Sequence, residues 1–337
     1  MHDRDEPRLP SVDPDRYAAI AAALEAEIAN VIVGQHGLVR DALCCLLAEG
    51  HLLIEGVPGL GKTQLVLALS SVVGLDSGRI QFTPDLMPAD IVGTQVLETD
   101  DTGSRSFRFA AGPVFTNLLL ADEVNRATPK TQSALLEAMQ ERRVTAGGAT
   151  RELPRPFLVL ATQNPIDQEG TYPLPEAQLD RFMLKSRVGM PSSDELVSII
   201  ERTTGAVTPQ CSQVAEAPEI LAMIELTRSV PVPSHVVRYA ADLVLATHPG
   251  DGANELVDRY VRFGASPRGA QALLLGAKVT ALRDGRPSVA VDDVRAVAHA
   301  ALRHRIGLGY EAAVDAVDGD RLVSALLDSV ETAPAEV

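Results

Sequence analysis

The sequence predicts an α/β domain built on a parallel sheet, followed by an all-helical domain. Three short apolar runs, at residues 51–55, 118–121 and 157–161, have the length of buried parallel strands, and helical stretches separate them. From residue 191 onward the apolar residues recur at helical spacing. These observations divide the chain into a flexible tail at 1–15, an α/β domain at 16–190, a helical domain at 191–332 and a disordered tail at 333–337.

Helical periodicity supports each predicted helix in order. Apolar residues recur at three- and four-residue spacing over 17–28, 39–47 and 65–73, and Gly74 is placed to end the third of these helices. In the second domain, the pattern of a capping box begins at Ser192. Six helices are expected there, at 193–204, 217–229, 234–247, 267–283, 291–303 and 319–330.

Composition and charge restrict the class of protein. Hydrophobic residues make up 46% of the 337 residues and charged residues 22%, which is the balance of a globular chain. No apolar stretch approaches the roughly 18 residues that span a membrane, and the first 11 residues lack the apolar region of a signal peptide. We therefore expect a cytoplasmic protein with no membrane insertion. The net charge of −15 disfavours binding to nucleic acid, which needs clustered Lys and Arg.

A complete phosphate-binding motif follows the first predicted strand. Residues 56–63 match the pattern G-x-x-x-x-G-K-[ST] in full, between a strand and a helix. The glycines allow backbone N–H groups to turn toward a β-phosphate, and the N-terminus of the following helix adds partial positive charge. Lys62 can reach the β- and γ-phosphates, and the Thr63 hydroxyl can bind Mg²⁺. The sequence therefore predicts an ATP site formed by Gly56, Val57, Pro58, Gly59, Leu60, Gly61, Lys62, Thr63 and Gln64.

Two acidic residues end the second predicted strand, about 60 residues after this motif. Both carboxylates emerge at the carboxyl end of the strand, where the ligands of parallel α/β sheets bind. Asp122 would hold Mg²⁺, and Glu123 would polarise the water that attacks the γ-phosphate. Four apolar residues and two acids on their own can be an ordinary strand end, so the two motifs support each other.

The residues around these acids, at 120–127, resemble the Walker B region of MoxR-type AAA+ ATPases, and the resemblance extends over about residues 17–312. Asn164, at the end of the third predicted strand, corresponds to the sensor 1 residue of that family, whose amide holds the attacking water or the γ-phosphate. From the residues alone, Asn164 can equally cap the turn before the next proline. The segment 31–35 resembles the one that lines the adenine pocket, which implies nucleotide binding by Val33 and Gly34.

Two arginines complete the resemblance. Arg181 lies in a segment similar to the one that presents an arginine finger to a neighbouring subunit. Arg268 lies in a segment similar to sensor 2, where it opens a lid helix that folds back over the nucleotide. Alternatives stay open, since Arg181 can pair internally with Glu176 or Asp180, and Arg268 can be a solvated residue of a first helical turn. The rival finger candidates are Arg126, Arg142 and Arg143.

Two predicted hairpins distinguish this branch of the family. The first joins residues 92–97 to 106–109 through an Asp-x-Gly turn, and the second has Gly-Gly at its turn within 144–151. By resemblance they correspond to the helix-2 insert and the pre-sensor-1 hairpin, which face the central pore or a partner. Ordinary surface hairpins explain the same patterns equally well.

The resemblance implies a three-layer P-loop domain with a helical lid. It also implies an ATPase that binds ATP and Mg²⁺ and assembles as a homo-oligomer, with a hexameric ring as the expected form. MoxR-like proteins are similar to chaperones that remodel or mature partner complexes with von Willebrand factor A-domain proteins, and this is the leading hypothesis. A chelatase-type or nucleic-acid motor is the alternative within the same class. A nucleotide-gated regulatory scaffold is the alternative from another class, and the presence of Glu123 argues against it.

Overall fold

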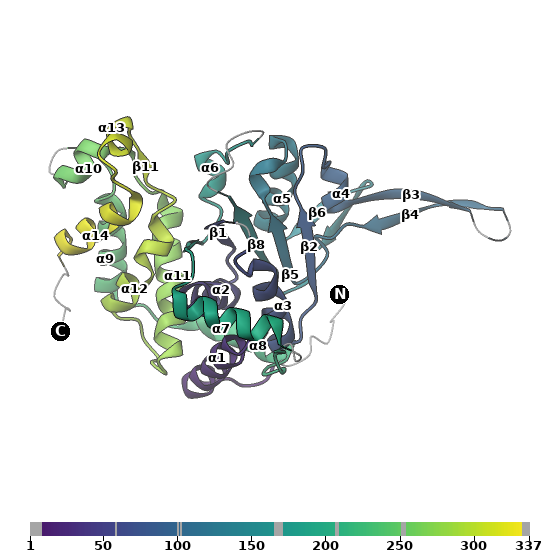
Figure 1. Cartoon of the computed structure of the whole chain (residues 1–337), viewed down its shortest axis with the longest axis horizontal. Helices are drawn as coiled ribbons and strands as arrows, with labels where there is room; N and C mark the ends of the chain where they lie inside the picture. The colour runs from purple at the N-terminus through teal and green to yellow at the C-terminus, as the bar shows by residue number, and fades with distance from the viewer. Residues whose placement is uncertain are drawn as a thin grey trace, which may run out of the picture.

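The computed structural model has a sheet-containing body, a helical part packed against one side of it, and a long projecting hairpin (Figure 1). It describes residues 9–57, 59–99, 101, 103–164, 171–205, 209–250 and 254–331. Within these ranges, no helix is both long enough and apolar enough to cross a membrane. Residues 1–8 of the predicted N-terminal tail and the whole predicted tail at 333–337 lie outside the description, and the first helix already begins at Pro14.

The body is built on a five-stranded sheet in the order β2-β5-β8-β1-β9, in which every neighbouring pair is parallel. The three strands predicted from the sequence are the three central ones. The two edge strands, β2 and β9, were not predicted, because neither has a continuous apolar run. The bounds are β1 Leu52–Gly56, β2 Ser77–Gln81, β5 Leu118–Asp122, β8 Leu158–Gln163 and β9 Leu184–Val188.

Alternate residues of the central strands belong to two different cores. Leu52 and Ile54 of β1 pack in one core with the helices α1, α2 and α3, whereas Leu53 packs in the other core with α5. Helices therefore cover both faces of the sheet, and the predicted three-layer α/β class is confirmed. These helices are α1 Pro14–Ala29, α2 His36–Leu47, α3 Lys62–Val73 and α5 Pro129–Glu141; two shorter ones are α4 Pro88–Val92 and the 3₁₀ turn η1 Val124–Arg126.

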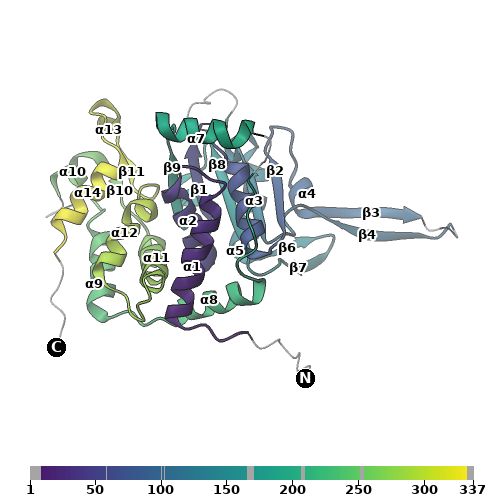
Figure 2. The same ribbon diagram turned by 60° about the horizontal axis from the view of Figure 1, so that its bottom comes forward.

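Both predicted hairpins are formed. The first consists of β3 (Gly93–Thr99) and β4 (Arg105–Ala111) and projects far from the sheet (Figures 1 and 2). The second consists of β6 (Arg143–Ala146) and β7 (Ala149–Glu152) and lies against the base of the first. The Gln95 amide donates to the Gly147 carbonyl at 2.8 Å, and the Arg151 guanidinium lies 3.7 Å from the centre of the Phe109 ring. Their contact with a pore or a partner stays a prediction.

The helical part agrees closely with the sequence. All six predicted helices are present within two residues at each end, and two short helices and a two-stranded antiparallel ribbon are added to them. The ribbon is a departure from the all-helical expectation. The helices are α7 Ser193–Thr204, α8 Ala217–Ser229, α9 Ser234–Leu245, α10 Glu255–Tyr260, α11 Pro267–Arg283, α12 Val291–Leu302, α13 Tyr310–Val314 and α14 Gly319–Ser329; the ribbon is β10 Val261–Phe263 with β11 Gly307–Leu308.

The first part of the helical region packs on the sheet-containing body. Arg202 of α7 donates to the carbonyl of Asn30 at 2.8 Å, and the Val214 N–H before α8 donates to the Val72 carbonyl at 2.8 Å. Helices α9 to α14 form the group at the left of Figure 1. The division at 190/191 stays a prediction.

Candidate nucleotide site

The phosphate-binding motif occupies the turn between β1 and α3. Gly59 and Gly61 have φ values of +83° and +76°, a left-handed conformation that residues with a Cβ rarely adopt. Gly61 is the N-cap of α3 and has no side chain to bond the N–H groups of the first turn, so these groups are left for phosphate oxygens. Pro58, also predicted for the site, lies outside the described residues.

A cavity opens over this turn at the carboxyl ends of the central strands. It collects most of the predicted nucleotide, metal and catalytic residues, together with three residues that the sequence did not indicate, Arg79, Gln81 and Thr162. Val57 and Leu60 belong to the turn but do not line the cavity. The predicted residues that line this P-loop cavity are Gly56, Gly59, Gly61, Lys62, Thr63, Gln64, Asp122, Glu123 and Asn164.

Lys62 is folded back onto its own loop. Its ammonium group donates to the Gly56 carbonyl at 2.5 Å. Burial lowers the pKa of Lys62, while the charges of Asp122 and Glu123 act in the opposite direction. The ammonium group is therefore positioned at the mouth of the phosphate-binding turn, held by a neutral carbonyl that a phosphate oxygen can replace.

The Asp122 carboxylate has a partner on each oxygen. Oδ1 accepts a hydrogen bond from the Thr162 hydroxyl at 2.7 Å, and Oδ2 accepts one from the Arg79 guanidinium at 2.7 Å. Thr162 comes from β8 and Arg79 from β2, so the strands on both sides of β5 orient this side chain. A carboxylate beside the Thr63 hydroxyl supplies the oxygen ligands that Mg²⁺ prefers, with water and phosphate completing the shell.

Glu123 adopts a left-handed backbone conformation, with φ at +57°, directly after β5. Its N–H donates to the Thr162 hydroxyl at 2.8 Å, which fixes the turn. The carboxylate accepts from Arg126 at 2.9 Å and from the Gln81 amide at 3.2 Å. A non-glycine residue in this conformation is costly and is typical of functional sites. Arg126, one of the rival finger candidates, therefore contacts the Glu123 carboxylate of its own chain.

Val33 and Gly34 line a second cavity, between the turn before α2 and the segment that joins β9 to α7. Gly34 has φ +74°, and a Cβ there would overlap the carboxyl group of Glu195. Gln35, in the same turn, donates its amide to the Leu60 carbonyl at 2.8 Å and so ties this cavity to the phosphate-binding turn. The predicted adenine pocket is thus built next to the predicted phosphate site.

Arg181 and Arg268 do not line the P-loop cavity. They line a third cavity, here named the arginine cavity, that shares no lining residue with the P-loop cavity. Arg268 is thus found in a different cavity from the phosphate-binding turn, and its expected role in a lid helix that folds back over the nucleotide stays a prediction. The charged residues of the arginine cavity are Arg181, Arg228, Arg268 and Arg305, with Glu49 and Asp180.

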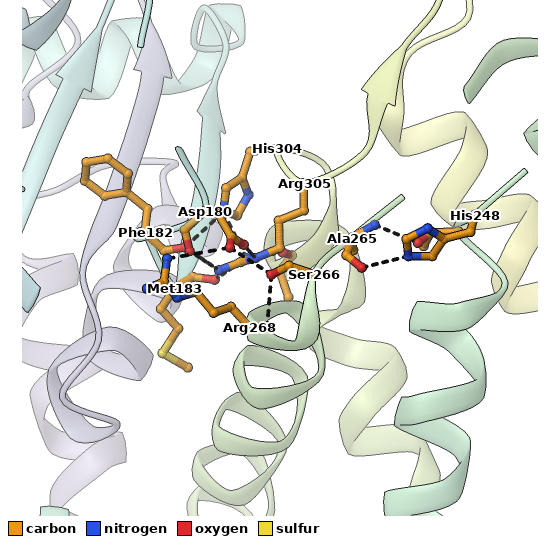
Figure 3. A network of polar contacts seen from close by, with 11 residues as sticks. Asp180, Phe182, Met183, His248, Ala265, Ser266, Arg268, His304 and Arg305 are labelled. Carbon is orange, nitrogen blue, oxygen red and sulfur yellow. Dashed lines mark hydrogen bonds and ion pairs between the residues drawn. The ribbon is translucent and has the colours of Figure 1, made fainter. Parts of the chain in front are cut away.

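A polar network around Asp180 explains where Arg268 lies (Figure 3). The Asp180 carboxylate accepts from Arg305 at 2.8 Å and from the Ser266 hydroxyl at 2.8 Å, and Arg268 lies 3.7 Å away. Arg305 is buried and also donates to the Phe182 carbonyl at 2.6 Å. Ser266 caps α11 by accepting from the Arg268 N–H at 3.1 Å. The start of α11 is therefore fastened to the segment that carries Arg181.

The remaining finger candidates have separate partners. Arg142 donates to the carboxylate and to the carbonyl of Glu49, both at 2.8 Å, and Arg143 pairs with Glu141 at 3.3 Å. Over the described part of the chain, Arg181 forms no ion pair with Glu176 or Asp180, which pair with other arginines. Its Nε is buried without a hydrogen-bond partner in that part of the chain. Arg181 therefore stays the finger candidate that the internal contacts explain least.

The turn, the paired carboxylates and the parallel sheet define a P-loop protein of the AAA class. Residues 51–184 match the model of the ATPase family associated with various cellular activities, and residues 253–326 match the model of the AAA lid domain. The match to the AAA family model ends in β9.

Comparisons over nearly the whole chain identify the branch of the AAA class to which it belongs. The chaperone MoxR1 of Mycobacterium tuberculosis is 45% identical over 90% of this chain and 80% of its own length, and the MoxR protein of Paracoccus denitrificans is 32% identical over 90% and 93%. A crystal structure from Cytophaga hutchinsonii superposes with a TM-score of 0.89 at 38% identity and covers 95% of this chain and 97% of that one. The chain belongs to the MoxR family of AAA+ ATPases, which confirms the resemblance noted from its motifs.

Proposed function

We propose that this chain hydrolyses ATP in the presence of Mg²⁺ and uses the reaction to remodel or mature partner proteins. The observation that carries the proposal is the convergence of Lys62, Thr63, Asp122, Glu123 and Asn164 on one cavity, from the ends of two strands and a helix N-terminus. A glycine-rich phosphate turn, a carboxylate for Mg²⁺ and a second carboxylate for water are the parts that phosphoryl transfer to water needs.

Each residue has a role in the proposed reaction. Lys62 and the N–H groups at the start of α3 hold the phosphates and meet the charge of the transition state. Thr63 and Asp122 would hold Mg²⁺, whose positive charge would offset that of the phosphates. Glu123 polarises the water for in-line attack on the γ-phosphate. Asn164, which is 8% exposed and lines the same cavity, orients that water or the γ-phosphate.

The proposed active form is a ring, with six subunits as the expected number. Arg181 and Arg268 lie in a cavity separate from the phosphate site of their own chain. Four arginines and two acids line that cavity, so it carries excess positive charge on a chain of net charge −15. An anion brought by a second copy would satisfy this excess, and the γ-phosphate of the neighbouring nucleotide is such an anion.

The names of the relatives support a chaperone-like role. One of them is named a chaperone, and two are named MoxR. We propose the same chaperone-like work for this chain, in the cytoplasm, with a von Willebrand factor A-domain protein as the partner. Coexpression with such a protein and copurification of the pair test this part of the proposal, and a pair that never associates in any nucleotide state contradicts it.

The reaction itself is tested by separating binding from chemistry. Lys62→Ala removes the phosphate cation and should bind a fluorescent ATP analogue at least tenfold more weakly. Glu123→Gln keeps the shape of the site but removes the base, so it should bind ATP normally and release phosphate at least a hundredfold more slowly than the wild type. Glu311→Gln, an exposed glutamate of α13, is the matched control and should behave as the wild type.

Phosphate release by Glu123→Gln at the wild-type rate would show that Glu123 is not the base. If the wild-type protein binds no ATP and releases no phosphate at any protein concentration, the ATPase proposal itself is wrong.

A further inference from the structure

Arg79 is a second cation in the P-loop cavity, beside Lys62. It lies on the edge strand β2, where Arg79 is paired with Leu120 and Gln81 with Asp122 of β5. Ile80, between them, is buried in the core on the opposite face of the sheet. Because strand residues alternate, Arg79 and Gln81 share the face that looks into the cavity.

The Arg79 guanidinium is bonded to the Asp122 carboxylate oxygen that a metal ion would use. It donates to Oδ2 of Asp122 at 2.7 Å, and the same nitrogen donates to the Gln81 amide oxygen at 2.7 Å. The other carboxylate oxygen, Oδ1, already accepts from Thr162. A divalent cation or a water of its shell therefore competes with the guanidinium for Oδ2, because two cations repel each other at one carboxylate.

The Arg79 side chain has the freedom to move. It is 51% exposed, whereas the Asp122 side chain is 18% exposed, so the arginine is the solvated partner of the pair. An ion pair of this kind contributes little to stability and is easily exchanged. Arg79 lines the same cavity as Lys62 and the phosphate-binding turn, and phosphate is a strong bidentate partner for a guanidinium.

We propose that Arg79 is an exchangeable cation of this site. It neutralises Asp122 in the metal-free state and transfers to the γ-phosphate of the nucleotide bound to its own chain when Mg²⁺ takes its place on Asp122. This inference rests on the proposed ATPase function. It adds an arginine supplied in cis to the one that a neighbouring subunit would supply through Arg181. Lys62 at the start of α3 and Arg79 of β2 thus provide two cations to the same cavity.

The test uses the full chain and two binding measurements. The variant Arg79→Met removes the charge and keeps the length of the side chain, and Arg79→Lys keeps the charge. Arg16→Met is the matched control, because Arg16 is a 58% exposed arginine of α1 in an ion pair with Glu219, outside the cavity. Thermal unfolding confirms that each variant is folded.

The first measurement is Mn²⁺ binding to the nucleotide-free protein, followed by the electron paramagnetic resonance of free Mn²⁺. Removal of the competing guanidinium should tighten Mn²⁺ binding by about threefold in Arg79→Met, the size expected for an exposed ion pair. Arg16→Met should leave Mn²⁺ binding unchanged. Unchanged or weaker Mn²⁺ binding in Arg79→Met would overturn the exchange and leave Arg79 as a structural contact of β2 with β5.

The second measurement compares fluorescent ATP and ADP analogues in excess Mg²⁺, in a Glu123→Gln background so that hydrolysis does not interfere. Arg79→Met should weaken ATP binding roughly tenfold and ADP binding much less, because the lost contact is to the γ-phosphate. Arg79→Lys should recover part of the preference for ATP. An unchanged ratio of ATP to ADP affinity in Arg79→Met would overturn the phosphate contact.

Failure of the proposed function gives a different pattern. If the protein with its wild-type Arg79 binds neither analogue, the ATPase proposal fails, while Mn²⁺ binding to the nucleotide-free protein still decides whether Arg79 and a metal ion compete for Asp122.

Discussion

The P-loop cavity and the arginine cavity have complementary chemistry. The P-loop cavity has a glycine-rich turn and the carboxylates Asp122 and Glu123, each already neutralised by an arginine of its own chain. The arginine cavity has four arginines for two acids and is placed where α11 is fastened to the segment around Asp180. In the proposed reaction the first binds phosphate and Mg²⁺, whereas the lining of the second has fewer acids than arginines.

In the proposed ring, each cavity is one half of a composite site. A phosphate site that needs a further cation and a cation cavity that needs an anion are both satisfied when two copies meet. The network that joins Asp180 to Arg305 and Ser266 also offers a route for coupling, because it links the start of α11 to the segment next to Arg181 by hydrogen bonds.

The largest loss of ATP hydrolysis is expected from substitution of Arg181, the arginine finger candidate. Arg181→Ala should bind ATP with nearly wild-type affinity and hydrolyse it about 10³-fold more slowly at every protein concentration, because the transition-state charge loses its cation. Phosphate release and analogue binding are measured in parallel. Arg143→Ala is the control, since Arg143 is exposed and pairs only locally with Glu141. If Arg143→Ala shows the larger loss, the finger has been assigned to the wrong arginine.

A smaller loss is expected from Arg268. Its guanidinium is 44% exposed and lies 3.7 Å from Asp180, so it contributes to the arginine cavity without being part of the buried core. Arg268→Ala should reduce the rate of phosphate release about tenfold and leave ATP affinity of the isolated subunit unchanged. Arg238→Ala, an exposed arginine of α9, is the control. Weaker ATP binding by monomeric Arg268→Ala would show that Arg268 acts on the nucleotide bound to its own chain.

The smallest effect concerns the stability of the arginine cavity. His51 is buried in its wall, where its ring accepts from the Val159 N–H and donates to the Met139 carbonyl, both at 3.1 Å. Burial lowers the pKa of His51 to about 4 from 6.5. As the pH falls, the unfolded chain therefore takes up a proton on this histidine before the folded chain does. The free energy of unfolding decreases from pH 6.5 toward pH 4, by about 2 kcal/mol at pH 5.

Denaturant unfolding at pH 7 and pH 5 measures this loss. The variant His51→Gln should be less stable than the wild type at pH 7 but should lose less stability between the two pH values. His36→Gln, an exposed histidine of α2, should lose as much as the wild type. Equal losses in the wild type and His51→Gln would show that His51 does not carry the pH dependence.

The parts of the site that the sequence predicted are those encoded in contiguous residues. The phosphate-binding turn, the acids after β5 and Asn164 after β8 each follow a buried apolar strand, so pattern and position can be recognised together. Arg79 could not be recognised in this way, because its role depends on the register of β2 against β5, and β2 is an edge strand with one buried residue. The arginine cavity, which Arg268 lines, could not be recognised either, because it depends on the contact of Asp180 with Arg305, and these residues are 125 positions apart in the chain.

The composite site is tested most directly by mixing two inactive variants. Arg181→Ala lacks the finger and Lys62→Ala lacks the phosphate cation, so each should be nearly inactive alone, but a mixed ring contains interfaces where an intact Lys62 meets an intact Arg181. Phosphate release should reappear on mixing and rise with total protein concentration. If mixed oligomers form, as shown by copurification of differently tagged variants, and no activity returns, Arg181 does not act across the interface and the two cavities are not halves of one site.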